Sequence, residues 1–136
     1  MEIILAENHG FCYGVKRAVE MANEAANGAG KSYTLGPIIH NPQVVGRLES
    51  KGVKPIDEVS DIDSGTMIIR SHGVGPAIYE EAENKGLNIV DATCPHVKKA
   101  QQDAKSVIED GMTLVILGEK DHPEVKSINL WANNEG

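Results

Sequence analysis

The sequence predicts an α/β fold in which parallel strands alternate with covering helices. Two observations support this fold class. Short apolar runs of strand length alternate with longer stretches whose apolar residues recur at helical spacing. The sequence also repeats itself: after a shift of about 82 residues, Cys12 aligns with Cys94 and His40 aligns with His122. A repeat that keeps its reactive residues in register indicates a repeated site.

The repeat also predicts the domain organisation. We expect parallel-sheet units with flanking helices, one complete and one partial. The first unit covers residues 1–93, although its N-terminal strand could belong to a neighbouring unit, and the incomplete second unit covers residues 94–136. Because the second unit stops partway through the period, we expect the chain to be part of a longer polypeptide.

In the first unit, the apolar run at residues 2–6 predicts a buried strand. Small apolar residues at helical spacing predict a helix over 14–26, and 32–35 reads as a short strand. Asn41, followed by Pro42, has the residue types of a helix cap and first turn, so a second helix should run from there to Lys51 and Gly52.

The rest of the chain continues the alternation after a polar connection at 54–65. The next strand is 66–70, and the Gly-rich turn 71–76 should deliver a helix that ends near Glu83. The remaining predicted elements are a strand at 87–91, a helix over 97–108, a strand at 113–117 and a last helix opened by His122, Pro123 and Glu124.

The charge balance excludes some classes of partner. The net charge is −7 and the pI is about 5.2, which argues against nucleic acid or an anionic membrane as the main partner. No apolar run is long enough to span a bilayer, and no signal peptide pattern opens the sequence, so we expect a cytoplasmic protein. In that compartment two cysteines are typical of thiols, metal ligands or redox groups rather than a disulfide.

The two cysteines each occupy a predicted strand-to-helix turn, Cys12 in the first unit and Cys94 in the second. Helix N-termini favour thiolates, so this matched placement suggests metal ligation. The alternative is that both are small buried apolar residues. Two thiolates cannot close a tetrahedral site or hold a four-iron cluster unaided.

Three histidines share a second placement. His40, His72 and His122 each follow a predicted strand and precede a helix entry rich in Pro or Gly. In parallel sheets such loops lie at the carboxyl ends of the strands, so the three imidazoles could converge into a phosphate cradle. Each could instead be an ordinary hydrogen-bonded loop histidine, as we expect for His9 and His96.

Glu124 falls in the first turn of the last predicted helix. It could simply compensate the helix dipole. Beside an anionic ligand, however, its carboxyl group could act as a proton donor.

Five motifs together resemble the 4-hydroxy-3-methylbut-2-enyl diphosphate reductase (LytB) family, over the whole chain and in order. The motifs are Gly10-Phe11-Cys12 with Gly14-Val15-Lys16-Arg17-Ala18, Ile39-His40-Asn41-Pro42, Arg70-Ser71-His72-Gly73-Val74, Asp91-Ala92-Thr93-Cys94-Pro95 and His122-Pro123-Glu124-Val125. The resemblance implies an N-terminal part of a three-unit trefoil around a [4Fe–4S] cluster. It also implies reductive dehydroxylation of the allylic diphosphate substrate to isopentenyl and dimethylallyl diphosphate, the last step of the non-mevalonate isoprenoid pathway.

The resemblance also assigns roles to residues. Cys12 and Cys94 match cluster ligands, His40, His72 and His122 match the residues that hold the diphosphate, and Glu124 matches the proton donor. A ferredoxin or flavodoxin would supply the electrons. Because the third cysteine ligand is absent from this chain, we expect no reductase activity from the chain alone.

Two other functions remain open at this point. The chain could be a non-catalytic module that binds a diphosphate or another anion. It could also be a zinc protein that uses its two cysteines and several histidines.

Overall fold

A four-stranded parallel sheet forms the centre of the protein, and it confirms the predicted α/β class. The computed structural model describes residues 1–7 and 9–136. The strand order is β2-β1-β3-β4, and every neighbouring pair is parallel. The strands are β1 (Ser32–Leu35), β2 (Val53–Ile56), β3 (Thr66–Ile69) and β4 (Asn88–Asp91).

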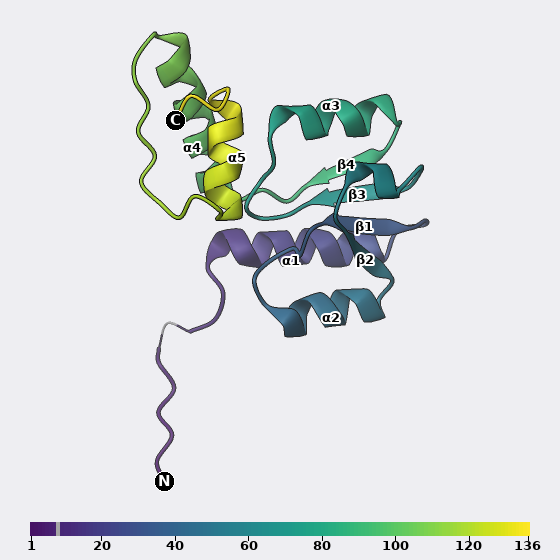
Figure 1. The fold of residues 1–136 in the computed structure, drawn as a ribbon. Helices are drawn as coiled ribbons and strands as arrows, with labels where there is room; N and C mark the ends of the chain where they lie inside the picture. Colours follow the sequence, from purple (N-terminus) through teal and green to yellow (C-terminus); the bar gives the residue numbers. More distant parts are fainter. Residues whose placement is uncertain (8) are drawn as a thin grey trace.

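Helices cover both faces of this sheet (Figure 1). On one face lie α1 (Tyr13–Ala26) and α2 (Pro42–Ser50), and on the other lie α3 (Pro76–Asn84) and the short 3₁₀ helix η1 (Val59–Asp61). These bounds agree closely with the helices expected from apolar spacing. None of the helices in the described part of the chain is both long and apolar enough to cross a lipid bilayer.

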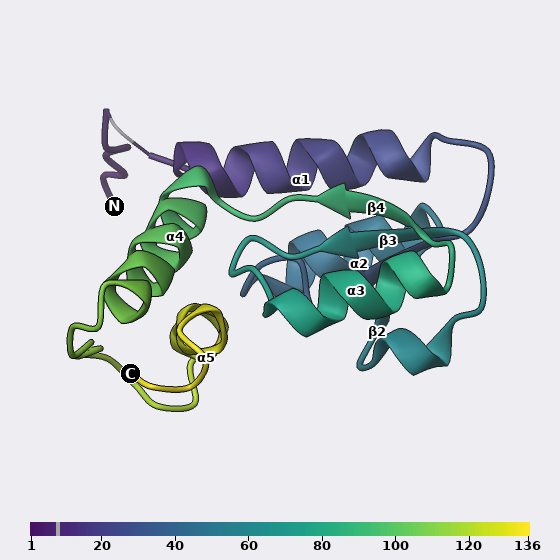
Figure 2. The same cartoon turned by 90° about the horizontal axis from the view of Figure 1, so that it is seen from above.

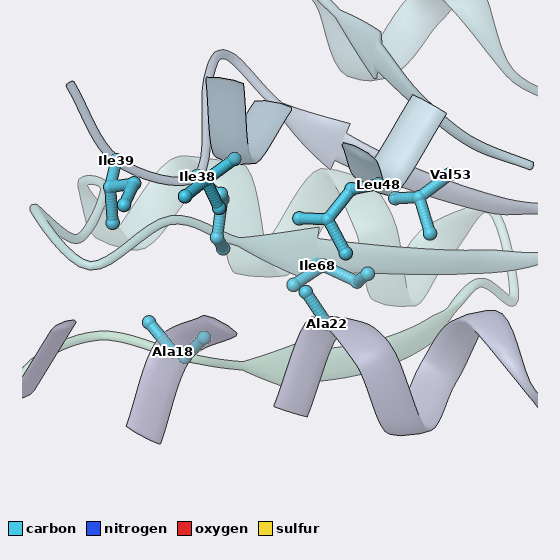
Figure 3. Close-up of a cluster of buried hydrophobic side chains, with 9 residues drawn as sticks. Ala18, Ala22, Ile38, Ile39, Leu48, Val53 and Ile68 are labelled. Carbon is cyan, nitrogen blue, oxygen red and sulfur yellow. The ribbon is translucent and has the colours of Figure 1, made fainter. Parts of the chain in front are cut away.

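Each face of the sheet buries its own apolar cluster, and the central strand β3 contributes to both. Ile68 packs towards α1 and α2, whereas Met67 and Ile69 pack towards α3, and all three are fully buried. Figure 3 shows the first cluster, in which the small side chains of Ala18 and Ala22 let α1 lie close to the sheet. The alternation of β3 side chains therefore fixes both helical layers.

Residues 94–136, called the second unit below as in the prediction, contain two helices that pack against each other beside residues 1–93, called the first unit (Figures 1 and 2). They are α4 (Pro95–Glu109) and α5 (Pro123–Trp131). The side-chain amide of Gln101 donates a 2.6 Å hydrogen bond to the Ser127 hydroxyl between them. The indole of Trp131 donates a 2.9 Å bond to the Val74 carbonyl, which joins α5 to the first unit.

Two predicted strands are wrong, because residues 2–6 and 113–117 carry no strand. Their side chains are exposed, for example Ile4 at 83% and Leu117 at 101% of full exposure. The sequence pattern detects apolar residues suited to a buried strand. A strand also needs a hydrogen-bonded neighbour, and no described strand pairs with either segment.

One strand was missed, since the region expected to be a polar connection contains β2. Pro55 lies within β2, although proline is disfavoured inside a strand. The structure explains the exception: β2 is the edge strand, with β1 as its only neighbour in the described sheet. A proline is tolerated where a missing N–H costs no ladder hydrogen bond.

Candidate functional site

The two cysteines occupy equivalent positions, as the repeat predicts. Cys12 is the N-cap of α1 and Cys94 is the N-cap of α4, and neither side chain caps its helix. In each case the cysteine carbonyl accepts a 3.0 Å hydrogen bond from the residue four positions later, Lys16 or Lys98. Each cysteine therefore lies at the N-terminal end of a helix, beside the free N–H groups of its first turn.

Gly14 brings the two cysteine turns into contact. It lies in the first turn of α1, and a Cβ added there would overlap the Sγ of Cys94. The sulfur of Cys94 thus rests against the backbone two residues beyond Cys12. No disulfide joins the two cysteines. The sequence motif contained Gly14, but its spacing gave no sign that Cys94 would fill this space.

Backbone hydrogen bonds connect the cysteine turn to the histidine loops. The N–H of Cys94 donates a 2.9 Å bond to the Ser71 carbonyl. Ser71 in turn donates from both its N–H and its hydroxyl to the Ile38 carbonyl, each at 3.2 Å. The loops that carry Cys94, His72 and His40 are therefore held in fixed positions relative to one another at the carboxyl ends of the strands.

The three predicted loop histidines come together. The ring centroids of His40 and His72 are 4.4 Å apart, and each ring lies 5.7 Å from the ring of His122. The three residues come from three separate places in the chain, two in the first unit and one in the second. The predicted convergence occurs, but His122 reaches the cluster as the N-cap of α5 and not from the end of a strand, because residues 113–117 form none.

A hydrogen bond determines the tautomer of His122, and burial lowers the pKa of His72. His122 is the N-cap of α5, and its Nδ1 accepts a 3.2 Å hydrogen bond from the Glu124 N–H. In the neutral ring the proton must then be on Nε2, which can donate to a ligand. Burial, together with the nearby charges of His40, Arg70 and His122, lowers the pKa of His72 to about 4. His72 is therefore neutral at pH 7.

The turn after His72 requires a glycine at position 73. Its φ is +72°, and a Cβ there would overlap the side-chain amide of Gln101 and lie 3.0 Å from both the Ser127 hydroxyl and a Thr93 methyl group. The turn therefore packs directly against α4 and α5. This close approach places His72 beside His122, across the boundary between the two units.

The remaining candidates fall inside and outside this cluster. Glu124 is half-buried in the first turn of α5, next to His122. His9 and His96 are exposed. The Nδ1 of His9 lies 2.8 Å from the Ala6 carbonyl, so it has an ordinary local partner. The functional roles of the clustered residues stay predictions.

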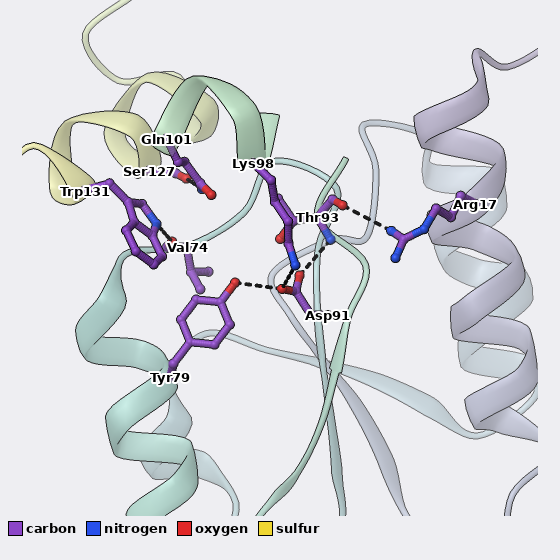
Figure 4. Close-up of polar contacts among 9 residues, drawn as sticks. All are labelled: Arg17, Val74, Tyr79, Asp91, Thr93, Lys98, Gln101, Ser127 and Trp131. Carbon is purple, nitrogen blue, oxygen red and sulfur yellow. Dashed lines mark hydrogen bonds and ion pairs between the residues drawn. The ribbon is translucent and has the colours of Figure 1, made fainter. Parts of the chain in front are cut away.

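A second polar network braces the boundary between the units (Figure 4). The Asp91 carboxylate accepts from the Tyr79 hydroxyl at 3.0 Å and pairs with Lys98 at 2.6 Å. Burial would raise the pKa of Asp91, but hydrogen bonds from Lys98 and Thr93 and the charge of Lys98 lower it overall. Burial and the charge of Asp91 raise the pKa of Tyr79 to about 12. This network ties β4 to α3 and α4 just before Cys94.

The donor set suits part of a cluster site rather than a closed metal site. Within residues 1–7 and 9–136, no group of three or more His, Cys, Asp or Glu side chains is arranged to hold a metal ion. The two neighbouring thiols at helix N-termini could supply two of the ligands of an iron–sulfur cluster. Further ligands would have to come from outside the described residues.

Comparison with known proteins gives a consistent result. The sequence model of the family described as "LytB protein" matches residues 3–136. The 4-hydroxy-3-methylbut-2-enyl diphosphate reductases of Geotalea uraniireducens and Geobacter sulfurreducens are each 56% identical to the chain, over 99% and 97% of it. The chain spans about half the length of these curated relatives, 48% and 47%.

Solved structures show the same fold. A structure of (E)-4-hydroxy-3-methyl-but-2-enyl diphosphate reductase superposes with a TM-score of 0.84 at 46% identity, over 97% of this chain and 47% of that one. The E-1-hydroxy-2-methyl-but-2-enyl-4-diphosphate reductase of Plasmodium falciparum gives 0.90 at 32% identity, over 95% and 41%. Since the family match covers nearly the whole sequence and the fold agrees, the chain belongs to the LytB protein family.

Proposed function

We propose that this chain carries the diphosphate-binding part and two cluster ligands of a 4-hydroxy-3-methylbut-2-enyl diphosphate reductase. The observation that carries the proposal is the cluster of His40, His72 and His122, in which His40 and His72 follow strands of the sheet and His122 caps α5. Relatives more than 50% identical to the chain bear the name of this enzyme.

The histidine cluster has the chemistry to bind the diphosphate. The Nε2–H of His122 can donate to a phosphate oxygen, and the N-terminus of α5 adds a favourable dipole at the same place. His72 is neutral at pH 7 and therefore also presents one ring N–H as a donor. The Nδ1 of His72 is buried and has no hydrogen-bond partner among the described residues. A phosphate oxygen of a bound ligand could accept a hydrogen bond from this nitrogen when it carries the ring proton.

Glu124 and the two cysteines supply the remaining roles in the proposal. The reaction replaces the C–O bond of the substrate with a C–H bond, and it consumes two electrons and two protons and releases water. Glu124, beside His122, would deliver a proton to the departing hydroxyl group. Cys12 and Cys94 would hold two irons of a [4Fe–4S] cluster, which supplies Lewis acidity and electrons when bound.

The proposal extends to partners. The substrate would be an allylic diphosphate, and a ferredoxin or flavodoxin would donate the electrons. The cytoplasmic location expected from the sequence stays a prediction. Because the third cysteine ligand is absent from this chain, we expect no turnover from the chain alone.

A non-catalytic anion-binding module is the second candidate, and the same histidine cluster favours it. This candidate requires the three imidazoles but neither thiol. The zinc alternative has no geometric support within the described residues, where no three-ligand metal group occurs.

A chimera would test the proposed function directly. The chain would replace the matching 48% of the Geotalea uraniireducens reductase, with which it is 56% identical. After anaerobic reconstitution, we expect the chimera to convert 4-hydroxy-3-methylbut-2-enyl diphosphate to isopentenyl and dimethylallyl diphosphate. A chimera that is folded by circular dichroism but does not turn over the substrate would contradict the proposal.

Variants of the chimera separate the two candidate functions. If the chain is part of a reductase, Cys12→Ser, Cys94→Ser and Glu124→Gln should each lower turnover by at least about tenfold, as for the loss of a general acid or a ligand. His96→Gln, an exposed histidine outside the cluster, should not. If the chain only binds anions, the chimera would not turn over the substrate, so these variants would have no turnover to lose.

A further inference from the structure

We propose that Arg17 is a positioning residue of the cysteine pair, because its hydrogen bond holds the turn before Cys94 against the first turns of α1. This helix begins directly after Cys12. The consequence for cluster binding rests on the proposed function, since it assumes that both thiols bind one cluster. The placement of the two turns does not depend on that assumption and is measurable on the chain alone.

A long-range hydrogen bond places the Arg17 side chain at this turn. Its Nη1 donates at 3.1 Å to the backbone carbonyl of Thr93, 76 residues further along the chain. Figure 4 shows the guanidinium reaching from α1 to that carbonyl. Thr93 directly precedes Cys94, the N-cap of α4. The bond therefore joins the helix that starts after one cysteine to the peptide group that leads into the other.

The other hydrogen bonds of this turn lead away from α1. The Thr93 N–H donates to the Asp91 carboxylate at 2.9 Å. The Cys94 N–H donates to the Ser71 carbonyl, also at 2.9 Å. Both bonds fix the turn to the ends of β4 and β3. Among the described residues, the bond from Arg17 is the only hydrogen bond between α1 and the segment that runs from β4 into α4.

The packing of α1 at this point leaves the position of the turn to that hydrogen bond. Gly14 contributes no side chain, and the Cys94 sulfur fills the space that its Cβ would take. Ala18, which is fully buried, contributes only a methyl group. Small side chains permit a close approach but form only low ridges, so they interlock little with their neighbours. A directional bond from Arg17, one turn after Gly14, supplies the register.

Loss of this bond would leave the Thr93 carbonyl unpaired. Thr93 is fully buried and Arg17 is half-buried, and no other donor among the described residues bonds this carbonyl. Removing a charged donor from a buried carbonyl favours local opening of its segment by about tenfold or more. The segment that would open carries Cys94, so the two cysteine turns would lose their fixed relative position.

Amide hydrogen exchange of the chain, followed by NMR at pH 7, would test the positioning. In Arg17→Gln we expect the amides of Thr93 and Cys94 to exchange about tenfold faster or more, while the amides at the C-terminal end of α2, whose fraying leaves this bond intact, keep their rates. Arg17→Lys should restore part of the protection, since an ammonium can donate to the same carbonyl. Lys16→Gln is the matched control: it removes a charge from the neighbouring, exposed position, keeps the backbone N–H, and should leave these rates within about twofold.

The same variants in the reductase chimera extend the test to the cluster. After anaerobic reconstitution, iron release to a chelator would be followed by absorbance in the absence of substrate. We expect Arg17→Gln to release iron about tenfold faster or more than the unsubstituted chimera, as for the loss of a residue that orients metal ligands. Arg17→Lys should be intermediate, and Lys16→Gln should stay within about twofold.

The outcomes separate this inference from the proposed function. Unchanged exchange at Thr93 and Cys94 in Arg17→Gln would overturn the positioning role, even with a lower unfolding free energy in urea, because the contact would then only stabilise the fold. Equal acceleration at the end of α2, the same acceleration in Lys16→Gln, or equal iron release from both chimeras would also overturn it. Failure of the proposed function would appear differently, as an unsubstituted chimera without turnover, and the exchange rates would still decide the role of Arg17.

Discussion

His72 is kept neutral by its surroundings, and this gives the protein a specific acid sensitivity. Its pKa is lowered from 6.5 to about 4 in the folded state, mainly by burial. At a pH between 4 and 6.5, the unfolded chain therefore binds a proton at His72 more readily than the folded chain does. The contribution of this residue to the unfolding free energy is constant above pH 6.5, falls as the pH falls towards 4, and levels off below.

Urea denaturation at pH 7.5 and pH 4.5 would check this expectation. In the His72→Gln variant, we expect a smaller loss of unfolding free energy on acidification than in the wild-type chain, because the titrating group has gone. His96→Gln is the control, since His96 is exposed and should keep the wild-type loss. An unchanged loss in His72→Gln would show that His72 does not titrate in this way.

Gly14 gives a prediction about the thiol pair. In Gly14→Ala the new methyl group overlaps the Sγ of Cys94, so we expect a loss of about 1–3 kcal/mol in unfolding free energy from overpacking. Gly46→Ala is the matched control within α2, where no atom lies within 4 Å of the added Cβ. There we expect a gain of about 0.5–1 kcal/mol from helix propensity. Equal gains in both variants would contradict the close approach of Cys94 to Gly14.

Among the secondary-structure elements, α2 is linked to the candidate site by its cap residue, Asn41. Its side-chain oxygen accepts hydrogen bonds from the N–H groups of Gln43 and Val44, both at 3.1 Å, and so fixes the start of α2 directly after His40. We expect Asn41→Ala to lower the unfolding free energy by about 1 kcal/mol and Asn41→Asp to keep most of it. Thermal denaturation checks both values, and Asp behaving like Ala would exclude the cap.

The caps and apolar spacing made the helices predictable from sequence, whereas the strands depended on pairing that sequence does not show. Pro42 and Pro123 each begin a helix where expected, and α4 begins at Pro95, two residues before the predicted start. The runs 2–6 and 113–117 have strand composition but no neighbour in the described sheet. Local pattern thus determines a helix, whose hydrogen bonds are internal, better than a strand, whose hydrogen bonds are not.

The candidate site was predictable to a similar degree. Strand-end placement explains why His40 and His72 lie together, because β1 and β3 are parallel and share one carboxyl edge. His122 joins them although residues 113–117 form no strand, because α5 packs beside this edge. The packing of Gly14 against Cys94 and the hydrogen bond from Arg17 depend on contacts between distant segments. No spacing within the sequence reports such contacts.

At the scale of the whole molecule, apolar side chains divide into a closed core and two exposed segments. Ile68 is fully buried in β3, whereas Ile4 and Val115 are both 83% exposed. We expect Ile68→Ala to cost about 2–5 kcal/mol of unfolding free energy, through lost burial and a cavity. Ile4→Ala and Val115→Ala should each change it by less than about 0.5 kcal/mol. Urea denaturation of the three variants checks this, and a large cost at Ile4 or Val115 would show that these segments are packed in solution.

The assembly of one anion site from both units is the central claim, and a single titration tests it most directly. The imidazole resonances of the chain would be followed by NMR as pyrophosphate is added. We predict that the signals of His40, His72 and His122 shift together with one dissociation constant, while those of His9 and His96 stay in place. Shifts of all five histidines alike, or no shift in the three clustered residues, would contradict the account.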